Sequence, residues 1–125
     1  MPSSFEPVDA RHTPRLRLPA MYTLVRVRPT GYPKFLWTGY IYDISATGMR
    51  FELDVVLDPG TDIEVRAMLP GTSQITFDAR GKVVRIHDDE PGPCRMGMTF
   101  DHFRHHADRR ELQNYLEQSQ WSQAA

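Results

Sequence analysis

The chain has 125 residues, of which 40% are hydrophobic and 25% are charged, so it is long enough and apolar enough to fold as one domain around an ordered core. Its formal net charge of −1 at pH 7 disfavours a protein that grips long nucleic acid, because phosphate neutralisation requires a basic excess. The single cysteine, Cys94, excludes an intramolecular disulfide. The lack of a long apolar run argues against a signal peptide and against direct membrane insertion. We therefore expect a cytoplasmic protein.

The N-terminal segment is polar and rich in proline. Pro14 and Pro19 hold the residues before them in extended conformations, which opposes a helix in this part of the chain. We therefore expect residues 1–9 to form a flexible N-terminal tail that leads into a folded domain over residues 10–104.

Six segments of this domain have the composition of β-strands. Residues 49–54 alternate apolar and polar side chains, and other segments are rich in aromatic and β-branched residues. Turn residues separate the segments, as at residues 58–60, and Gly81 within one long segment indicates a bulge or bend. The expected strands are residues 21–28, 35–44, 49–54, 61–69, 74–86 and 94–100.

The last segment differs in composition from the rest. It is rich in helix formers and places Leu112, Tyr115 and Leu116 at helical spacing, which predicts a C-terminal helix over residues 105–121. Six short strands separated by turns indicate an all-β fold, either an antiparallel barrel or a sandwich, and closure into a barrel would remove the exposed strand edges.

Two arginines near the start of the domain form the first candidate binding motif. Arg11 and Arg15 lie four residues apart on a segment that Pro14 keeps from being helical, and in an extended chain this spacing covers at most about 13 Å. Each guanidinium is a planar fork of donors that matches phosphate oxygens and equally the O6 and N7 edge of guanine. The pair is therefore suited to gripping two parts of one nucleotide.

A second candidate motif follows the expected strand 35–44. On a strand Asp43 and Ser45 point to one side while Ile44 points to the other, so Ile44 can anchor in the core. A carboxylate can accept the N1–H and N2–H₂ donors of a guanine edge, and a serine hydroxyl can donate or accept. We expect Gly48 to allow a positive φ in the turn and to leave room for close approach of a ligand.

Taken singly, each motif is also typical of an ordinary polar surface or turn. In this order, Arg-x-x-x-Arg followed about 30 residues later by Asp-x-Ser-x-x-Gly resembles the signature of the PilZ domain family, and residues 96–100 resemble the last strand of that family. The likeness covers about residues 10–103. It implies a six-stranded antiparallel β-barrel, and with the C-terminal α-helix this is the fold that we expect.

The resemblance also implies a ligand, the second messenger cyclic di-GMP. By analogy Arg11 and Arg15 would hold phosphates and guanine, Asp43 and Ser45 would read a guanine edge, and Gly48 would complete the motif. No other cofactor is implied. The resemblance leaves open whether one or two ligand molecules bind.

Two further arginines, Arg50 and Arg95, are candidates for the same ligand-binding face. We expect a receptor in which the ligand orders the N-terminal tail. Because the sequence contains no second domain to act as the output, the signal would pass to a protein effector.

Other functions of a small barrel fit the sequence less well. A PilZ-like barrel can act as a nucleotide-independent protein adaptor, although all five motif residues are present here. A small barrel that binds single-stranded nucleic acid would require basic and aromatic residues on one face together with a basic balance. We expect no catalytic residues, since no nucleophile–base pair is visible, and no metal site, since His102, His105 and His106 lack a clearly placed further ligand.

Overall fold

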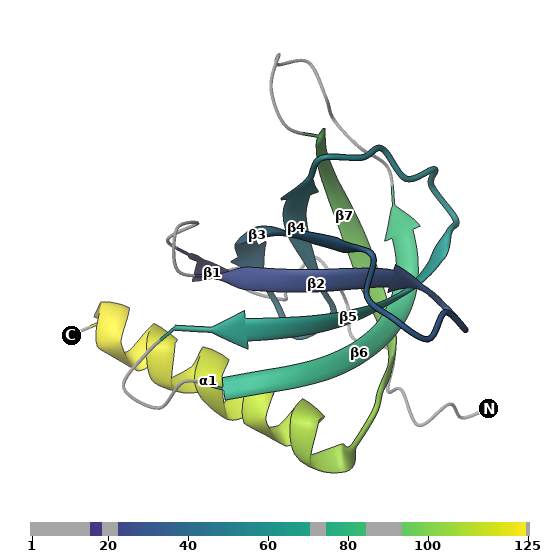
Figure 1. The fold of residues 1–125 in the computed structure, drawn as a ribbon. Helices are drawn as coiled ribbons and strands as arrows, with labels where there is room; N and C mark the ends of the chain where they lie inside the picture. The colour runs from purple at the N-terminus through teal and green to yellow at the C-terminus, as the bar shows by residue number, and fades with distance from the viewer. Residues whose placement is uncertain (1–15, 19–22, 71–74, 85–93, 125) are drawn as a thin grey trace.

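The computed structural model describes residues 16–18, 23–70, 75–84 and 94–124, with side chains described as far as residue 118. Within these ranges the chain forms seven strands and one helix (Figure 1). The elements are β1 (Leu16–Arg17), β2 (Leu24–Pro29), β3 (Trp37–Ile44), β4 (Gly48–Leu53), β5 (Asp62–Leu69), β6 (Ile75–Val84), β7 (Cys94–Phe103) and α1 (His106–Ala124). The motif arginines Arg11 and Arg15 lie outside the described residues.

Six of the strands close into an antiparallel barrel. Their order around the ring is β3-β2-β5-β6-β7-β4, and pairing between β3 and β4 closes it. This confirms the six-stranded antiparallel barrel with a C-terminal helix. The strand β1 was not predicted; it pairs with the end of β3 through Leu16 opposite Ile44 and Arg17 opposite Asp43, beyond the point where β2 stops pairing.

The six expected strands and the helix are all found, with ends that differ by at most three residues from those predicted. The predicted irregularity at Gly81 is also confirmed, because the register of β6 against β7 shifts between Arg80 and Gly81. A side chain at Gly81 would strike the carbonyl group of Thr99 on β7, so only glycine lets the two strands approach there.

The core lies inside the barrel and consists of the inward half of each alternating strand. Phe77, Phe100 and Phe103 pack at one end with ring centroids 5.3–5.9 Å apart, and the Phe77 and Phe100 rings meet edge to face. The largest fully buried side chains are those of Phe51, Phe77, Ile41, Ile44, Met49, Leu53, Ile63, Leu69, Met96, Leu112, Val25 and Val27.

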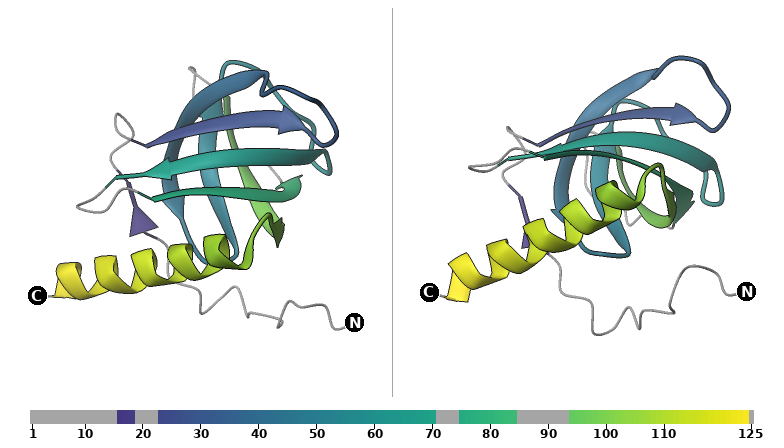
Figure 2. Two further views of the ribbon diagram at one scale, coloured as in Figure 1. Left: turned by 60° about the horizontal axis from the view of Figure 1, so that its bottom comes forward. Right: turned by 90° about the horizontal axis from the view of Figure 1, so that it is seen from below.

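The helix α1 covers one end of this barrel. It packs mainly against β6 and also contacts β1 and β7, and Figure 2 shows it running below the barrel and past its edge. Leu112 and Leu116 are buried, and the Tyr115 hydroxyl donates a 2.6 Å hydrogen bond to the Pro70 carbonyl oxygen. The three residues at helical spacing therefore form the face of α1 that docks on the barrel. No helix in the described ranges has both the length and the apolarity needed to cross a membrane.

We predict that Phe77→Ala lowers the free energy of unfolding by about 3–5 kcal/mol, because Phe77 is 1% exposed and its loss leaves a cavity among the aromatic rings. Thr76→Ala, at the exposed neighbouring position, is the control and should change stability by less than about 0.5 kcal/mol. Urea unfolding of the two variants and the parent measures both. Equal midpoints for Phe77→Ala and the parent would contradict the assigned core.

Candidate ligand site

A β-bulge near the end of β3 sets the geometry of the candidate site. Ile41 pairs with Phe51 and Asp43 pairs with Arg50, so Tyr42 is an extra residue in β3. An extra residue shifts the alternation of the strand by one position. Ile41 and Ile44 can therefore both be fully buried in the core although they lie three residues apart.

The same bulge brings charged and aromatic side chains together on the outside of the barrel. The Arg50 Nε atom lies 3.7 Å from Asp43 Oδ2, and Arg17 stands opposite Asp43 on β1. The Arg95 guanidinium lies over the Tyr42 ring, 5.6 Å from its centroid. Asp43 is 8% exposed, whereas Arg17, Arg50 and Arg95 are exposed. The result is a shielded carboxylate with Arg50 beside it and two further arginines on neighbouring strands. We call this set of residues the motif face: Arg17, Tyr42, Asp43, Arg50 and Arg95.

This environment changes the acidity of the tyrosine. Burial raises the pKa of the Tyr42 hydroxyl above its usual value of 10.0, and the negative charge of Asp43 raises it further. The nearby Arg50 and Arg95 guanidinium groups partly offset this rise. Tyr42 is therefore neutral at physiological pH and can donate a hydrogen bond.

Ser45 occupies the turn that joins β3 to β4. Its amide N–H donates a 2.8 Å hydrogen bond to the Gly48 carbonyl oxygen, and its hydroxyl oxygen accepts a 3.3 Å bond from the Thr47 amide. The hydroxyl also lies 3.3 Å from both the Thr47 hydroxyl and the Gly48 carbonyl oxygen. Ser45 is 1% exposed, so the bonds described for it hold the turn together. Contact of Ser45 with a ligand stays a prediction.

The expectation for Gly48 was wrong in one respect. Within the described ranges, only Gly31 and Gly60 have a positive φ, so the turn does not need the left-handed conformation at Gly48. Instead, a side chain at Gly48 would strike the carbonyl group of Met98 on β7. The glycine is required because β4 and β7 approach closely at this position.

The structure thus brings Asp43, Arg50 and Arg95 together on one face and places Ser45 and Gly48 in the adjoining turn. Sequence reasoning did not single out Tyr42 or Arg17 for this face. The signal for Tyr42 was the spacing of the two isoleucines in β3, which cannot share one side of a regular strand. Among the described residues, no three histidine, cysteine, aspartate or glutamate side chains gather to form a metal site.

The fold and this face define a small closed β-barrel domain with a polar, arginine-rich outer site beside the turn between β3 and β4. The PilZ domain family matches residues 9–118, and the chain belongs to that family. A search of curated proteins finds no match.

Solved structures with the same fold include three informative ones. The Bacillus subtilis inhibitor of motility MotI/DgrA has a TM-score of 0.71 and 17% identity, covering 98% of this chain and 56% of that one. The K. pneumonia MrkH–c-di-GMP complex has a TM-score of 0.67 and 20% identity, covering 94% and 54%. The PilZ domain of YcgR from Escherichia coli with c-di-GMP has a TM-score of 0.56 and 18% identity, covering 91% and 96%. The chain therefore spans about half the length of the first two proteins.

We predict that Gly48→Ala destabilises the barrel by about 1–3 kcal/mol, because the added methyl group has to push β4 away from β7. Thr99→Ala is the matched control, since Thr99 is exposed and lies directly opposite Gly48. Thermal and urea unfolding measure both variants. Full stability of Gly48→Ala would show that close strand packing does not explain the glycine.

We also predict that Tyr42→Phe removes a component that ionises above pH 10.0 from the absorbance titration of the phenolates. Because the folded-state pKa is raised, its contribution to stability is complete below pH 10.0 and is lost as the pH rises through the folded-state value. Tyr32→Phe is the control, because Tyr32 is 51% exposed. An unchanged titration curve for Tyr42→Phe would contradict the assigned environment.

Proposed function

We propose that this protein is a non-enzymatic receptor for cyclic di-GMP that binds the ligand on the motif face and signals to a protein effector in the bacterial cytoplasm. The observation that carries the proposal is the pairing of β1 with the end of β3. Leu16, the residue after Arg15 in the sequence, pairs with Ile44, and Arg17 pairs with Asp43. The segment with the two motif arginines therefore joins the barrel at the aspartate of the second motif.

The chemistry of the motif face suits a guanine nucleotide with two phosphodiesters. The Asp43 carboxylate can accept hydrogen bonds from the N1–H and N2–H₂ groups of guanine. Arg50 and Arg95 are exposed and carry forks of donors for phosphate oxygens or for the O6 and N7 edge. Arg11 and Arg15 would supply the same chemistry from the N-terminal segment. Two structurally similar proteins, MrkH and the YcgR PilZ domain, are complexes with c-di-GMP.

Ligand binding would be coupled to the state of the N-terminal segment. If Arg11 and Arg15 contact the ligand, the ligand has to favour the arrangement in which both arginines reach the motif face. The strand β1 directly follows this segment and contacts α1, so a change there reaches the helix. The newly presented surface would then be read by the effector.

A nucleotide-independent adaptor is the alternative. It is favoured by the fact that Ser45 and Gly48 both have a role without any ligand, Ser45 in holding the turn and Gly48 in letting β4 approach β7. An adaptor would keep these two residues for the fold. It would not need the exposed arginines beside Asp43.

Isothermal titration with cyclic di-GMP distinguishes the two functions. We expect saturable binding by the parent, and a loss of affinity of at least about tenfold for Arg15→Ala and for Asp43→Ala, because each removes a charged partner of the ligand. Arg110→Ala, at an exposed position on α1, is the control and should bind like the parent. The titration also gives the ligand stoichiometry.

The absence of binding heat, together with an unchanged melting temperature at high ligand concentration, would favour the adaptor. Binding that is equal in the parent and in Asp43→Ala would show that the ligand binds elsewhere. Thermal unfolding of each variant is measured alongside, so that loss of binding can be separated from loss of the fold.

A further inference from the structure

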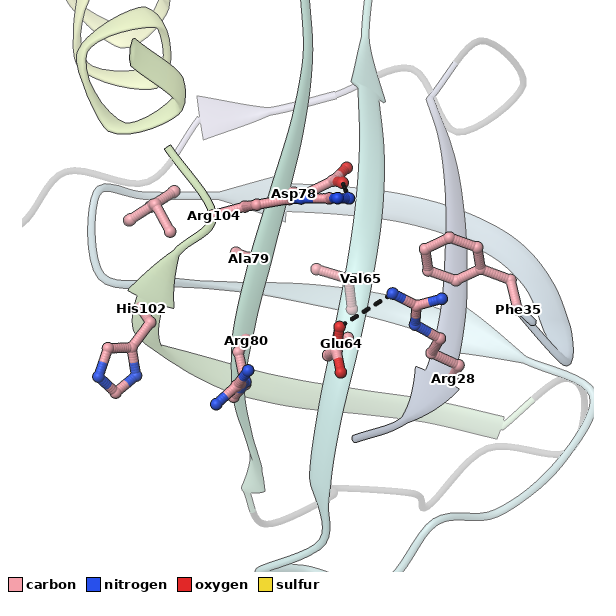
Figure 3. A pocket seen from close by; sticks show the side chains of 10 residues that line it. Arg28, Phe35, Glu64, Val65, Asp78, Ala79, Arg80, His102 and Arg104 are labelled. Atoms are coloured by element: carbon pink, nitrogen blue, oxygen red, sulfur yellow. Dashed lines mark hydrogen bonds and ion pairs between the residues drawn. The ribbon is translucent and has the colours of Figure 1, made fainter. Parts of the chain in front are cut away.

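A hollow lies on the side of the barrel away from the motif face, across the outer faces of β2, β5, β6 and the end of β7 (Figure 3). In the ring order β5 and β6 stand opposite β4 and β3, so this hollow is separate from the motif face. Its volume is about 440 Å³, which is in the range of binding sites. It is lined by Arg28, Phe35, Glu64, Val65, Asp78, Ala79, Arg80, His102, Phe103 and Arg104, and we call it the arginine groove.

The strand register arranges the charged side chains of the groove in two rows. In the first row Arg28 lies opposite Glu64, Glu64 opposite Arg80, and Arg80 opposite His102. Strands are about 4.8 Å apart, so a row across four strands is about 14 Å wide. In the second row Asp78, which lines the groove, is in register with Arg66 and Arg26, which adjoin the groove, and the Arg104 guanidinium reaches Asp78.

The negative charges of both carboxylates in the groove are already balanced by arginine side chains that bind them. Glu64 accepts a 3.0 Å hydrogen bond from Arg28 and a 3.2 Å bond from the Gly31 amide. Although burial alone would raise the pKa of Glu64, these bonds hold it below its usual value.

Asp78 is held still more firmly. It accepts two hydrogen bonds from Arg66, at 2.9 and 3.0 Å, and one from Arg104 at 3.2 Å. These bonds, from Arg66 first, lower the pKa of Asp78 against the effect of its burial. Glu64 and Asp78 are therefore ionised at neutral pH, and each is bound by arginine.

The two rows carry an excess of positive charge even after this pairing. Five arginines stand against the carboxylates of Glu64, Asp78 and Asp108, the last of which accepts a hydrogen bond from the Asp78 amide, and this leaves two positive charges on one face of a chain whose net charge is −1. Arg26 and Arg80 are exposed on β2 and β6. Such a concentration of positive charge attracts a negatively charged partner.

An aromatic side chain lies beside these charges. The Arg28 guanidinium is 4.5 Å from the centroid of the Phe35 ring, and that of Arg66 is 5.2 Å away. Leu36 and Tyr32, in the same connection between β2 and β3, are 50% and 51% exposed. Arginine and aromatic residues side by side are typical of the energetically important parts of protein interfaces.

We propose that the arginine groove is a docking site for an acidic segment of a protein partner, in which carboxylates meet the free donors of the arginine rows and an adjacent apolar residue packs on Phe35. A nucleic-acid strand fits less well, because the chain has a net charge of −1 and long nucleic acid is held mainly by a basic excess. The docking proposal does not rest on the proposal that cyclic di-GMP binds at the motif face.

The test uses fluorescence anisotropy with three labelled probes. The first is a peptide of about eight residues with glutamates around a central phenylalanine, which is long enough to cross the four strands. The second replaces every glutamate by glutamine, and the third is an oligothymidylate of similar length. Each is titrated with the full chain, with Arg80→Glu in the groove, and with Arg50→Glu on the motif face as the matched charge reversal.

We expect the acidic peptide to bind the parent and Arg50→Glu equally, to lose about tenfold or more in affinity with Arg80→Glu, and to bind more weakly as salt rises. The glutamine peptide should bind much more weakly than the acidic one. The proposal is overturned if the acidic peptide does not bind, if Arg80→Glu binds it as tightly as the parent, or if the oligothymidylate binds more tightly and loses its affinity with Arg80→Glu.

Cyclic di-GMP titrations of the same variants distinguish a failure of the docking proposal from a failure of the proposed receptor function. Arg80→Glu should bind cyclic di-GMP like the parent, and this also shows that the variant is folded. If the parent fails to bind cyclic di-GMP but binds the acidic peptide through Arg80, the receptor function fails while the docking site stands.

Discussion

The extra residue at Tyr42 in β3 is the constraint on which both the core and the motif face depend. It lets Ile41 and Ile44 enter the core from the same strand although they lie three residues apart. In a regular strand one of these isoleucines would face solvent and Asp43 would point inward, where an ionised carboxylate is costly. The bulge avoids both costs, because Asp43 faces outward beside Arg50 while remaining shielded.

The turn after β3 shows how residues of a binding signature can also serve the fold. The Ser45 hydroxyl accepts the Thr47 amide, and Gly48 lets β4 approach the Met98 carbonyl on β7. Both features lie at the β3–β4 pairing that closes the ring. A rigid closure beside Asp43 benefits a ligand site, because donors and acceptors that are already fixed lose less entropy on binding.

The sequence predicted most of the fold, because alternation with a period of two is a direct consequence of strands with one buried face. It did not predict β1, since the two residues Leu16 and Arg17 are too few to show a period. It predicted that Ile44 is anchored in the core, but it gave the wrong reason for Gly48, whose constraint comes from β7, some fifty residues away in the chain. The arginine groove was missed for the same reason, because its residues are adjacent only once the strand register is known.

The helix α1 contacts both sides of the barrel and so bears on whether the two proposed sites are independent. In its first turn the Asp108 carboxylate accepts a 3.2 Å hydrogen bond from the amide of Asp78, the aspartate at the centre of the second charged row. Farther along, α1 contacts β1, which pairs with the strand that carries Asp43. If a ligand at the motif face shifts β1 and α1 follows, the hydrogen bond between the Asp78 amide and the Asp108 carboxylate changes. The affinity of the arginine groove for its partner then changes as well. Linkage then requires that a partner in the groove alters ligand affinity by the same factor. A helix that stays in place leaves the two sites independent, so the position of α1 decides between a receptor with a coupled output and a domain with two separate binding faces.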